Sequence, residues 1–252
     1  MTGVDASLID ACRNARRVLC VTGAGVSRGS GVPTYRDAMT GLWANYRPED
    51  LATPEAFARD PALVTRWYDE RRLACLACTP NAGHRAIAAW QRRLGAAFTL
   101  VTQNVDNLHE RAGSPPAAVH HIHGTMFRWL DPETGQRYDA VDDRPLVEDD
   151  RYPPRSSAGQ ALRPDIVWFG EMLPTDVLAV VQAALEDCDL FVSAGTSGVV
   201  HPVAGFVHAV PPGATGIEVN PEPTPISDAF DHVVRLTAED GLPALIGADA
   251  GD

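Results

Sequence analysis

Short apolar runs that alternate with helix-patterned segments dominate the hydrophobic pattern of this chain. Helical spacing covers residues 6–17, 80–93, 177–185 and 203–209, and apolar runs typical of buried strands cover residues 18–21, 98–102, 119–122, 166–169, 190–194 and 215–219. Strands that alternate with helices are typical of a parallel sheet covered by helices. The pattern therefore predicts an α/β fold with a doubly wound, Rossmann-like parallel sheet.

Two segments depart from this alternation and predict a smaller unit attached to the sheet. Residues 37–79 are helical in pattern, and residues 126–163 are polar, rich in acidic residues and proline, with scattered aromatic side chains. We expect one domain over residues 1–252, with its large part formed by residues 1–36, 80–125 and 164–252. Residues 37–79 and 126–163 would form a small module, irregular in its second half, and the site would lie between the two parts.

Charge and composition argue against several classes of protein. The 252-residue chain carries a net charge of −12, whereas nucleic-acid binding depends on cationic side chains that neutralise phosphates. No apolar run approaches the ~18 residues of a membrane span, and the first residues lack the pattern of a secretory signal. An odd number of cysteines, 5, argues against a disulfide framework. We therefore expect a cytoplasmic protein that binds neither nucleic acid nor membrane. The sequence leaves the oligomeric state open, and we favour a monomer.

Two polar loops follow predicted strands and carry the main candidate chemistry. The first begins Gly23-Ala24-Gly25-Val26-Ser27 and runs to Pro33-Thr34-Tyr35-Arg36, and the second is Thr102-Gln103-Asn104-Val105-Asp106-Asn107-Leu108-His109. The carboxyl ends of parallel strands meet at one edge of a sheet, where nucleotides bind. Glycines let a backbone approach a pyrophosphate closely. The first loop lacks the full Gly-x-Gly-x-x-Gly spacing, so alone it is equally consistent with a tight strand-to-helix turn.

Together, the two loops resemble the cofactor-binding signatures of the sirtuins, the NAD-dependent protein lysine deacylases. Further motifs are similar to sirtuin motifs in the same order: His123-Gly124, Val167-Trp168-Phe169-Gly170-Glu171, Gly195-Thr196-Ser197 and Val219-Asn220-Pro221-Glu222. The resemblance implies NAD as the cofactor and acyl-lysine proteins as substrates. The NAD contacts that it implies are Gly23, Ala24, Gly25, Ser27, Pro33, Arg36, Gln103, Asn104, Asp106, Gly195, Thr196, Ser197, Asn220, Glu222 and Ala238.

The resemblance also implies a mechanism. In this family the acyl oxygen of a modified lysine attacks the NAD ribose as nicotinamide leaves, and a histidine base then activates a ribose hydroxyl that takes over the acyl group, giving O-acyl-ADP-ribose. His123 matches that base, because imidazole titrates near neutral pH. Asn104 is the second implied catalytic residue, and with Asp106 it would bind the nicotinamide end. The remaining implied roles are ribose binding by Gln103 and adenosine binding by Asn220 and Glu222.

Simpler interpretations of these residues stay open at this point. His123 could be a structural histidine, or could form a metal-binding pair with His121, because alternate strand residues share a face. Glu222 could be a solvated turn residue. The alternative functions are an NAD hydrolase or mono-ADP-ribosyltransferase on a sirtuin-like fold, and a non-catalytic NAD sensor.

A pair of residues upstream bears on the acyl group and the substrate. Tyr68 and Arg71 lie three residues apart, so they share a helix face, where a phenol and a guanidinium could bind a carboxylate at the end of an acyl chain. With the string at 80–87 they resemble the sirtuin branch that removes succinyl, malonyl or glutaryl groups, and Ala38 agrees with its roomier pocket. A solvated helix face is the alternative. The substrate peptide would pair with Val167, Trp168, Phe169, Gly170 and Glu171.

One common sirtuin feature is absent. Sirtuins usually carry two Cys-x-x-Cys pairs that bind a structural zinc between the catalytic histidine and the substrate strand. Here no cysteine occurs between Cys78 and Cys188, and Cys75-x-x-Cys78 is half of a tetrahedral site at most. We therefore expect no metal. The small module would depend on burial of apolar side chains, namely Phe127, Trp129, Leu130, Tyr138, Leu146 and Tyr152.

Overall fold

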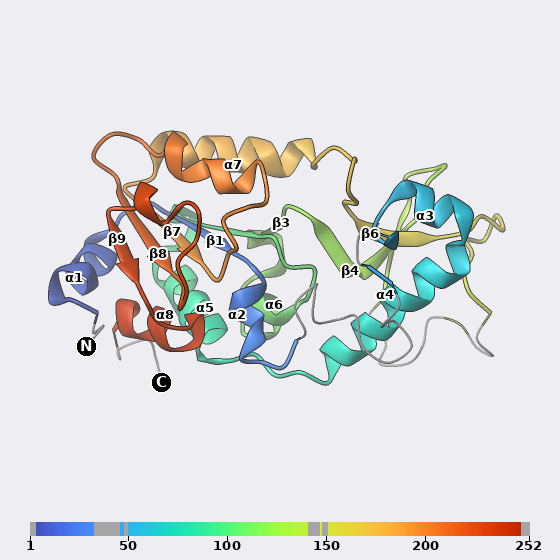
Figure 1. Ribbon diagram of the computed structural model, residues 1–252, viewed down its shortest axis with the longest axis horizontal. Coiled ribbons are helices and arrows are strands. Elements are labelled where there is room, and N and C mark those ends of the chain that lie inside the picture. Colours follow the sequence, from blue (N-terminus) through green and yellow to red (C-terminus); the bar gives the residue numbers. More distant parts are fainter. Residues whose placement is uncertain (1–3, 33–45, 48–49, 141–146, 148–150, 248–252) are drawn as a thin grey trace.

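A six-stranded parallel sheet forms the larger part of the protein (Figure 1). The structure is a computed structural model that describes residues 4–32, 46–47, 50–140, 147 and 151–247. The strand order is β3-β2-β1-β7-β8-β9, and the bounds are β1 Val18–Thr22, β2 Phe98–Thr102, β3 Val119–His121, β7 Leu190–Ala194, β8 Thr215–Val219 and β9 His232–Val234. Thr22 pairs with both Thr102 and Ala194. The carboxyl ends of the three central strands are therefore level with one another.

Helices cover both faces of this sheet, as alternation along β1 requires. Val18 and Cys20 belong to a core with α1 (Ala6–Asn14), α5 (Ala82–Leu94) and α8 (Ala238–Ile246). Leu19 and Val21 belong to a core with α7 (Thr175–Asp187) and the 3-10 helix η6 (Val203–Ala209). In Figure 1, α7 accordingly lies above the sheet and α5 and α8 lie below it. The predicted doubly wound α/β fold is confirmed.

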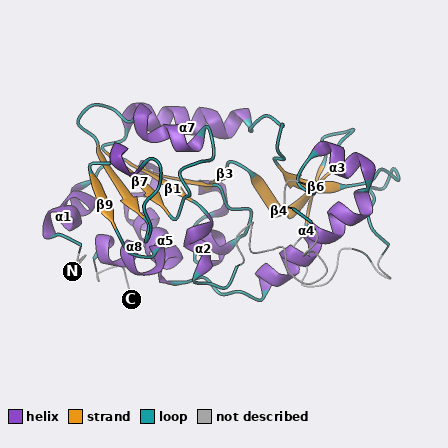
Figure 2. Cartoon of the chain, viewed as in Figure 1, coloured by secondary structure: helices purple, strands orange, loops and turns teal. Residues whose placement is uncertain are grey.

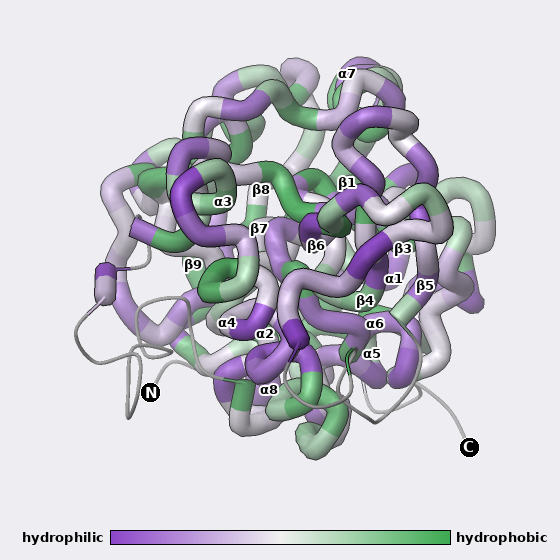
Figure 3. The backbone as a smooth tube through the Cα atoms, turned by 90° about the vertical axis from the view of Figure 1, so that its right-hand side faces the viewer, coloured by the Kyte–Doolittle hydropathy of each residue, from purple (hydrophilic) through white to green (hydrophobic). Residues whose placement is uncertain are grey.

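A second, antiparallel sheet lies at the other end of the molecule (Figure 2). Its order is β5-β4-β6, with β4 at Gly124–Leu130, β5 at Arg137–Asp139 and β6 at Arg163–Ile166. Helices α3 (Pro54–Arg59) and α4 (Pro61–Leu76) pack beside it, and Figure 3 looks onto this end of the molecule. Their shared core contains Trp67, Tyr68, Met126, Trp129 and Trp168. The remaining short elements are α2 (Ala24–Arg28), η3 (Gly95–Ala97), α6 (Leu108–Arg111), η4 (Pro116–Ala118) and η7 (Ser227–Ala229).

Several predicted elements are wrong in place or type. The strand expected at 166–169 is instead β6, which ends at Ile166 and belongs to the small antiparallel sheet. Val167 N still donates to His123 O, just before β4, but the two amides after it bond elsewhere: Trp168 N to the Glu171 carboxylate and Phe169 N to Ala52 O. The helix expected at 203–209 is a 3-10 helix. Residues 126–163 are not irregular throughout, since they carry most of β4, all of β5 and the start of β6.

Hydrogen-bonded turns hold the small sheet where zinc sites are usual in sirtuins. The Asp131 carboxylate is buried and accepts from the backbone N–H groups of Glu133 and Thr134, and the Ser156 hydroxyl also bonds to it. Ser156 belongs to a second turn, closed by its amide to Gln160 O at 2.8 Å. Asp131 therefore joins two turns that are distant in sequence. Within the described ranges no group of three or more His, Cys, Asp and Glu side chains could hold a metal.

Burial of apolar side chains adds to these turns, as expected for part of the predicted set. Trp129 is fully buried, Phe127 and Tyr138 are partly buried against the same core, and the Tyr152 hydroxyl donates to Asp69 at 2.6 Å. Leu146 lies outside the described residues. No helix in the described part of the chain is long and apolar enough to cross a membrane.

Chelation tests whether hydrogen bonds and burial are sufficient for this sheet. Incubation with a strong chelator is expected to leave the thermal unfolding midpoint unchanged, because we expect this sheet to hold no zinc. Removal of a structural zinc would have a large effect, since such an ion contributes about 10–16 kcal/mol to small zinc-dependent units. The measurement is thermal unfolding followed by circular dichroism, with and without chelator. A lower midpoint that added zinc restores would contradict the prediction.

Candidate active site

Glycines bring two strand ends into backbone contact. Gly25 N donates to Gly195 O at 2.9 Å, which joins the loop after β1 to the loop after β7. A Cβ atom on Gly25 would lie 2.7 Å from Gly195 Cα, and one on Gly23 would lie 2.8 Å from Gly195 O. Gly195 itself has a φ of +61°, which side chains disfavour. Only glycine fits this contact, which we call the glycine cradle. Packing of one loop backbone against the other accounts for these glycines, and their contact with a cofactor stays a prediction.

A buried polar network lies behind this cradle. The Ser27 hydroxyl donates to Asp106 Oδ2 at 2.8 Å and accepts from Asn104 Nδ2 at 3.1 Å. His84 Nε2 lies 3.3 Å from the same hydroxyl. Burial raises the pKa of Asp106, although hydrogen bonds from Leu108 N and Ser27 oppose the shift. Among the described residues no donor reaches Asn104 Oδ1, so the network orients this amide while leaving its oxygen available.

His123 lies immediately before β4 with a defined tautomer. Its Nδ1 is 3.1 Å from Gln103 O, and because a carbonyl only accepts, Nδ1 carries the hydrogen. In the neutral imidazole Nε2 is then the basic atom. Burial lowers the pKa of His123, and the bond to Gln103 opposes this only in part. His123 is therefore neutral at physiological pH, with one nitrogen ready to accept a proton.

His121, the last residue of β3, has the opposite charge preference. Its Nδ1 lies 2.9 Å from Asn104 O and its Nε2 lies 2.7 Å from Glu110 Oε1. Burial alone would lower the pKa of His121, but the hydrogen bond and charge of Glu110 raise it overall. The two histidines thus contact consecutive carbonyls, Gln103 O and Asn104 O, and do not form a metal-binding pair in this arrangement.

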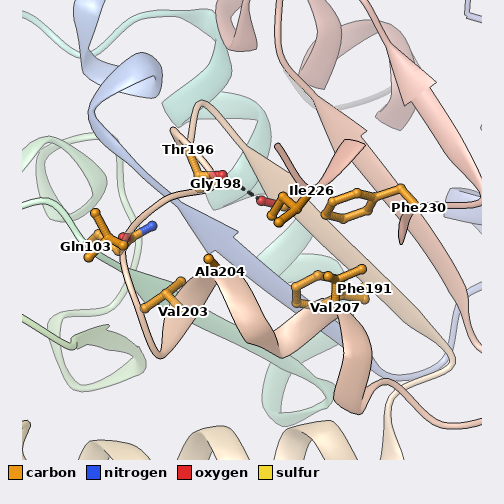
Figure 4. A pocket seen from close by; sticks show the side chains of 11 residues that line it. Gln103, Phe191, Thr196, Gly198, Val203, Ala204, Val207, Ile226 and Phe230 are labelled. Carbon is orange, nitrogen blue, oxygen red and sulfur yellow. Dashed lines mark hydrogen bonds between the residues drawn. The ribbon is translucent and has the colours of Figure 1, made fainter. Parts of the chain in front are cut away.

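Of the residues expected around the phosphates and adenosine, Thr196 lines a small hollow beside β7, and Asn220 bonds to the Thr196 backbone. Asn220 Nδ2 donates to Thr196 O at 2.6 Å, and Thr196 Oγ1 lies 3.0 Å from Ser193 Oγ. Ser197 and Glu222 are exposed. The hollow is lined by Gln103 and Thr196 together with apolar residues that include Phe191, Val203, Val207, Ile226 and Phe230 (Figure 4). Gln103 and Thr196 therefore line the same hollow.

Ala238 has a different position from the other implied NAD contacts. It is 2% exposed at the start of α8, and a Cβ on Gly83 would lie 2.7 Å from Ala238 O. Its backbone therefore packs α8 against the start of α5. Pro33, Arg36 and Ala38 lie outside the described residues.

The segment expected to pair with substrate leads directly from β6 past His123. Val167 N donates to His123 O at 3.0 Å. Phe169 is 54% exposed, and Gly170, with a φ of +86°, turns the chain back. The Glu171 carboxylate accepts from Arg163. The exposed Phe169 side chain therefore lies two residues after Val167, whose amide bonds to the backbone of the predicted base.

Tyr68 and Arg71 are brought together on α4 as expected, although Tyr68 is not on a solvated face. Tyr68 is 2% exposed, and its hydroxyl accepts from Trp168 Nε1 at 3.1 Å. The Arg71 guanidinium lies 4.9 Å from the Trp67 ring centre, and its charge acts on Tyr68. The alternative of a solvated helix face does not hold for Tyr68.

We did not predict from the sequence that His84, Glu110 and Arg163 contribute to the site. We considered His121 only as a metal ligand and did not predict its bonds to Glu110 and Asn104. His84 lies in a string that the sequence shows plainly, Pro80-Asn81-Ala82-Gly83-His84. Its capping bond with Asn81 and its approach to Ser27 depend on packing of α5 against α2. Nothing in the spacing indicates that contact.

The geometry agrees with what comparison with known proteins finds. The family model described as "Sir2 family" matches residues 23–202. The chain belongs to the Sir2 family. It is 45% identical to the "NAD-dependent protein deacylase" of Deinococcus radiodurans, over 95% of this chain and 97% of the relative. It is 47% identical to "NAD-dependent protein deacylase 1" of Pseudomonas aeruginosa, again over 95% of this chain and 97% of the relative.

Solved structures of Sir2 proteins have the same fold. A crystal structure of a Sir2 homologue in complex with NAD matches with a TM-score of 0.84 and 40% identity, over 96% of this chain and 93% of that one. A mutant Sir2 homologue in complex with 2'-O-acetyl ADP ribose matches with a TM-score of 0.86 and 39% identity, over 96% of this chain and 95% of that one. The sirtuin resemblance of the sequence is thus confirmed over nearly the whole chain.

The His121–Glu110 pair generates a prediction about stability and pH. Because the folded-state pKa of His121 is raised above 6.5, its contribution is complete below about pH 6.5 and is lost as pH rises through the raised pKa. Glu110→Gln is expected to lower the free energy of unfolding by about 1–3 kcal/mol near pH 6. The difference from the parent protein should shrink as the pH is raised from about 6 into the alkaline range, because the histidine then loses its proton.

The measurement is urea unfolding across this pH range, with Glu133→Gln, which removes a carboxylate from an exposed turn, as the matched control. A Glu110→Gln effect that is the same at every pH would show that charge on His121 plays no part.

Proposed function

We propose that the chain is an NAD-dependent protein deacylase that moves the acyl group of a modified lysine to ADP-ribose. The observation that carries this proposal is His123, a neutral imidazole with Nδ1–H on Gln103 O and a basic Nε2. The chain's relatives from Deinococcus and Pseudomonas carry the name NAD-dependent protein deacylase. A general base poised at its neutral form is what activation of a ribose hydroxyl needs.

The residues present fit NAD. The contact between Gly25 and Gly195 holds the loops after β1 and β7 together at the carboxyl edge of the parallel sheet, where nucleotides bind. Asn104 Oδ1 can accept from a carboxamide or hydroxyl, while Ser27 and Asp106 hold the amide in place. When bound, NAD supplies an electrophilic ribose carbon as nicotinamide leaves. His123 would take the proton from a ribose hydroxyl, and Gln103 would hold the ribose.

The proposal extends to acyl chains that end in a carboxylate, such as succinyl, malonyl and glutaryl. Tyr68 and Arg71 lie together on α4, and Tyr68 is joined through Trp168 to the segment that passes His123. A guanidinium and a phenol pair favourably with a carboxylate. Acetyl-lysine lacks that carboxylate, so it would be a poorer substrate.

His123→Ala tests the assignment of the base. The substitution is expected to lower deacylation by about 100-fold or more, the usual contribution of a general base, while NAD binding persists. Product formation from an acyl-lysine peptide and calorimetric titration with NAD measure the two properties. His120→Ala, on the opposite face of β3, is the matched control and should retain activity. Near-normal turnover by His123→Ala would refute the assignment.

Arg71→Met tests the acyl-carboxylate pocket. Loss of a charge-assisted hydrogen bond is worth about 1.5–3 kcal/mol, so the ratio of kcat/KM for succinyl-lysine to that for acetyl-lysine should fall about tenfold or more. Arg66→Met is the control, because it removes a positive charge from the same helix at a different place: the Arg66 guanidinium lies 5.6 Å from the centre of the Tyr152 ring. Equal losses on both substrates would undo the pocket assignment.

A further inference from the structure

A buried carboxylate lies under the loop that follows β8. Glu218, inside β8, is 1% exposed. The hydroxyls of Thr224 and Ser227 donate to its two oxygens, and Arg235 Nη1 donates to Glu218 Oε2 at 3.0 Å. A carboxylate that is removed from water needs such partners. The ion pair therefore joins β8 to the loop at 220–227 and to Arg235, the first residue after β9.

The same guanidinium also holds the backbone of the loop. Arg235 Nη1 lies 3.0 Å from Glu222 O and 3.4 Å from Asn220 O, and Nη2 lies 3.1 Å from Ser227 Oγ. Arg235 is the donor in each bond, because a guanidinium has no acceptor. Its planar fork of N–H groups can serve several acceptors at once, which a compact ammonium does less well. The course of residues 220–222 therefore depends on Arg235.

This loop lies beside the point of the sheet where a nucleotide is expected. The strands after β1 extend the sheet in both directions, with β2 on one side of β1 and β7 on the other, and nucleotides bind outside the carboxyl ends of parallel strands at such a point. Val219, the last residue of β8, pairs with Ala194, the last residue of β7. Asn220 Nδ2 donates to Thr196 O at 2.6 Å. The loops after β7 and β8 are therefore in contact beside the glycine cradle.

The position of His123 indicates which half of a dinucleotide would reach this loop. His123 bonds to Gln103 O in the loop after β2, whereas β7 and β8 lie on the other side of β1. The ribose on which the proposed base acts belongs to the nicotinamide half. A pyrophosphate at the glycine cradle would then direct the adenosine half toward β8, where the sequence predicts adenosine contacts for Asn220 and Glu222.

We propose that Arg235 is a positioning residue for the adenosine half of NAD: it holds the backbone of residues 220–222 and so sets where Asn220 and Glu222 meet the adenosine. Glu218 fixes the guanidinium in turn, since its strand is paired on both sides. This inference rests on the proposed function, and it adds a residue that touches no reacting atom. Loss of Arg235 should weaken NAD binding and leave the chemistry at His123 unchanged.

Arg235→Lys keeps a positive charge beside Glu218 but has a single nitrogen, which cannot serve the loop carbonyls and both side chains together. We expect the Kd for NAD to rise about threefold to tenfold, the effect of about one neutral hydrogen bond. At saturating NAD, kcat should be unchanged, because His123 is not displaced. Calorimetric titration measures the Kd, and deacylated peptide measures kcat.

A double variant removes the guanidinium without leaving a buried charge unpaired, which would destabilise the fold. Arg235→Met combined with Glu218→Gln removes every bond from the guanidinium to the loop, so the Kd for NAD should rise about tenfold or more. Thermal unfolding checks that both variants are folded. The matched control is Arg93→Met, which removes a guanidinium that donates to Cys12 O at 3.1 Å and should leave the Kd for NAD unchanged.

Two parts of NAD show which half is affected. The Kd for ADP-ribose, which keeps the adenosine half, should rise as much as the Kd for NAD. The Kd for nicotinamide mononucleotide, which lacks adenosine, should not change. Folded Arg235 variants that bind NAD and ADP-ribose as tightly as the parent protein would overturn the inference. An equal loss of affinity for nicotinamide mononucleotide, or a fall in kcat with no change in Kd, would overturn it as well.

The parent protein, measured alongside, separates this inference from the proposed function. If it binds NAD but turns over no acyl-lysine peptide, the proposed function is refuted, and the Kd values for NAD and ADP-ribose still decide the role of Arg235. If it turns over acyl-lysine peptide and the Arg235 variants bind NAD as it does, the proposed function stands and only the role of Arg235 is refuted.

Discussion

The backbone contact between Gly25 and Gly195 is the constraint on which the site depends. The hydrogen bond from Gly25 N to Gly195 O is possible because β1 and β7 pair in register and end at the same level, and because neither residue carries a Cβ. Ser27 follows within the same short helix and reaches Asn104 and Asp106 from β2's loop. A side chain at either glycine would separate the loops and displace this network.

The small sheet supplies the other side of the site, and it is tied to the large sheet through His123. Gly124, which begins β4, has a φ of +74°, and a Cβ there would lie 2.1 Å from Asp165 O in β6. His123, the predicted base, is held between β2's loop, through Gln103 O, and the segment after β6, through Val167 N. Hydrogen-bonded turns around Asp131 stabilise this sheet in the segment where sirtuins usually bind zinc. Both sides of the site therefore depend on backbone geometry more than on any single side chain.

Much of the large sheet could be predicted from sequence, because buried parallel strands such as 18–22 and 190–194 are continuous apolar runs bounded by glycine loops. The short edge strand β9 and helix α8, which contains Pro243, have no such signature. The strand at 163–166 was misplaced because Arg163 and Pro164 interrupt its pattern. His123 and the glycine loops were recognisable as motifs, whereas the bonds from His84 to Ser27 and from Trp168 to Tyr68 join residues 57 and 100 positions apart. Local spacing in the sequence carries no information on such distant pairs. The division of the chain into a large and a small part at the predicted boundaries stays a prediction.

The most direct test of the central claim is to follow both products in one reaction. The purified protein is incubated with NAD and with acetyl-, succinyl- or malonyl-lysine peptide, and nicotinamide and deacylated peptide are quantified in the same samples. A deacylase that uses His123 as its base releases nicotinamide only when an acyl peptide is present, in equal amount to the deacylated peptide. Nicotinamide release without peptide, or NAD binding without turnover of any of the three peptides, would contradict the claim.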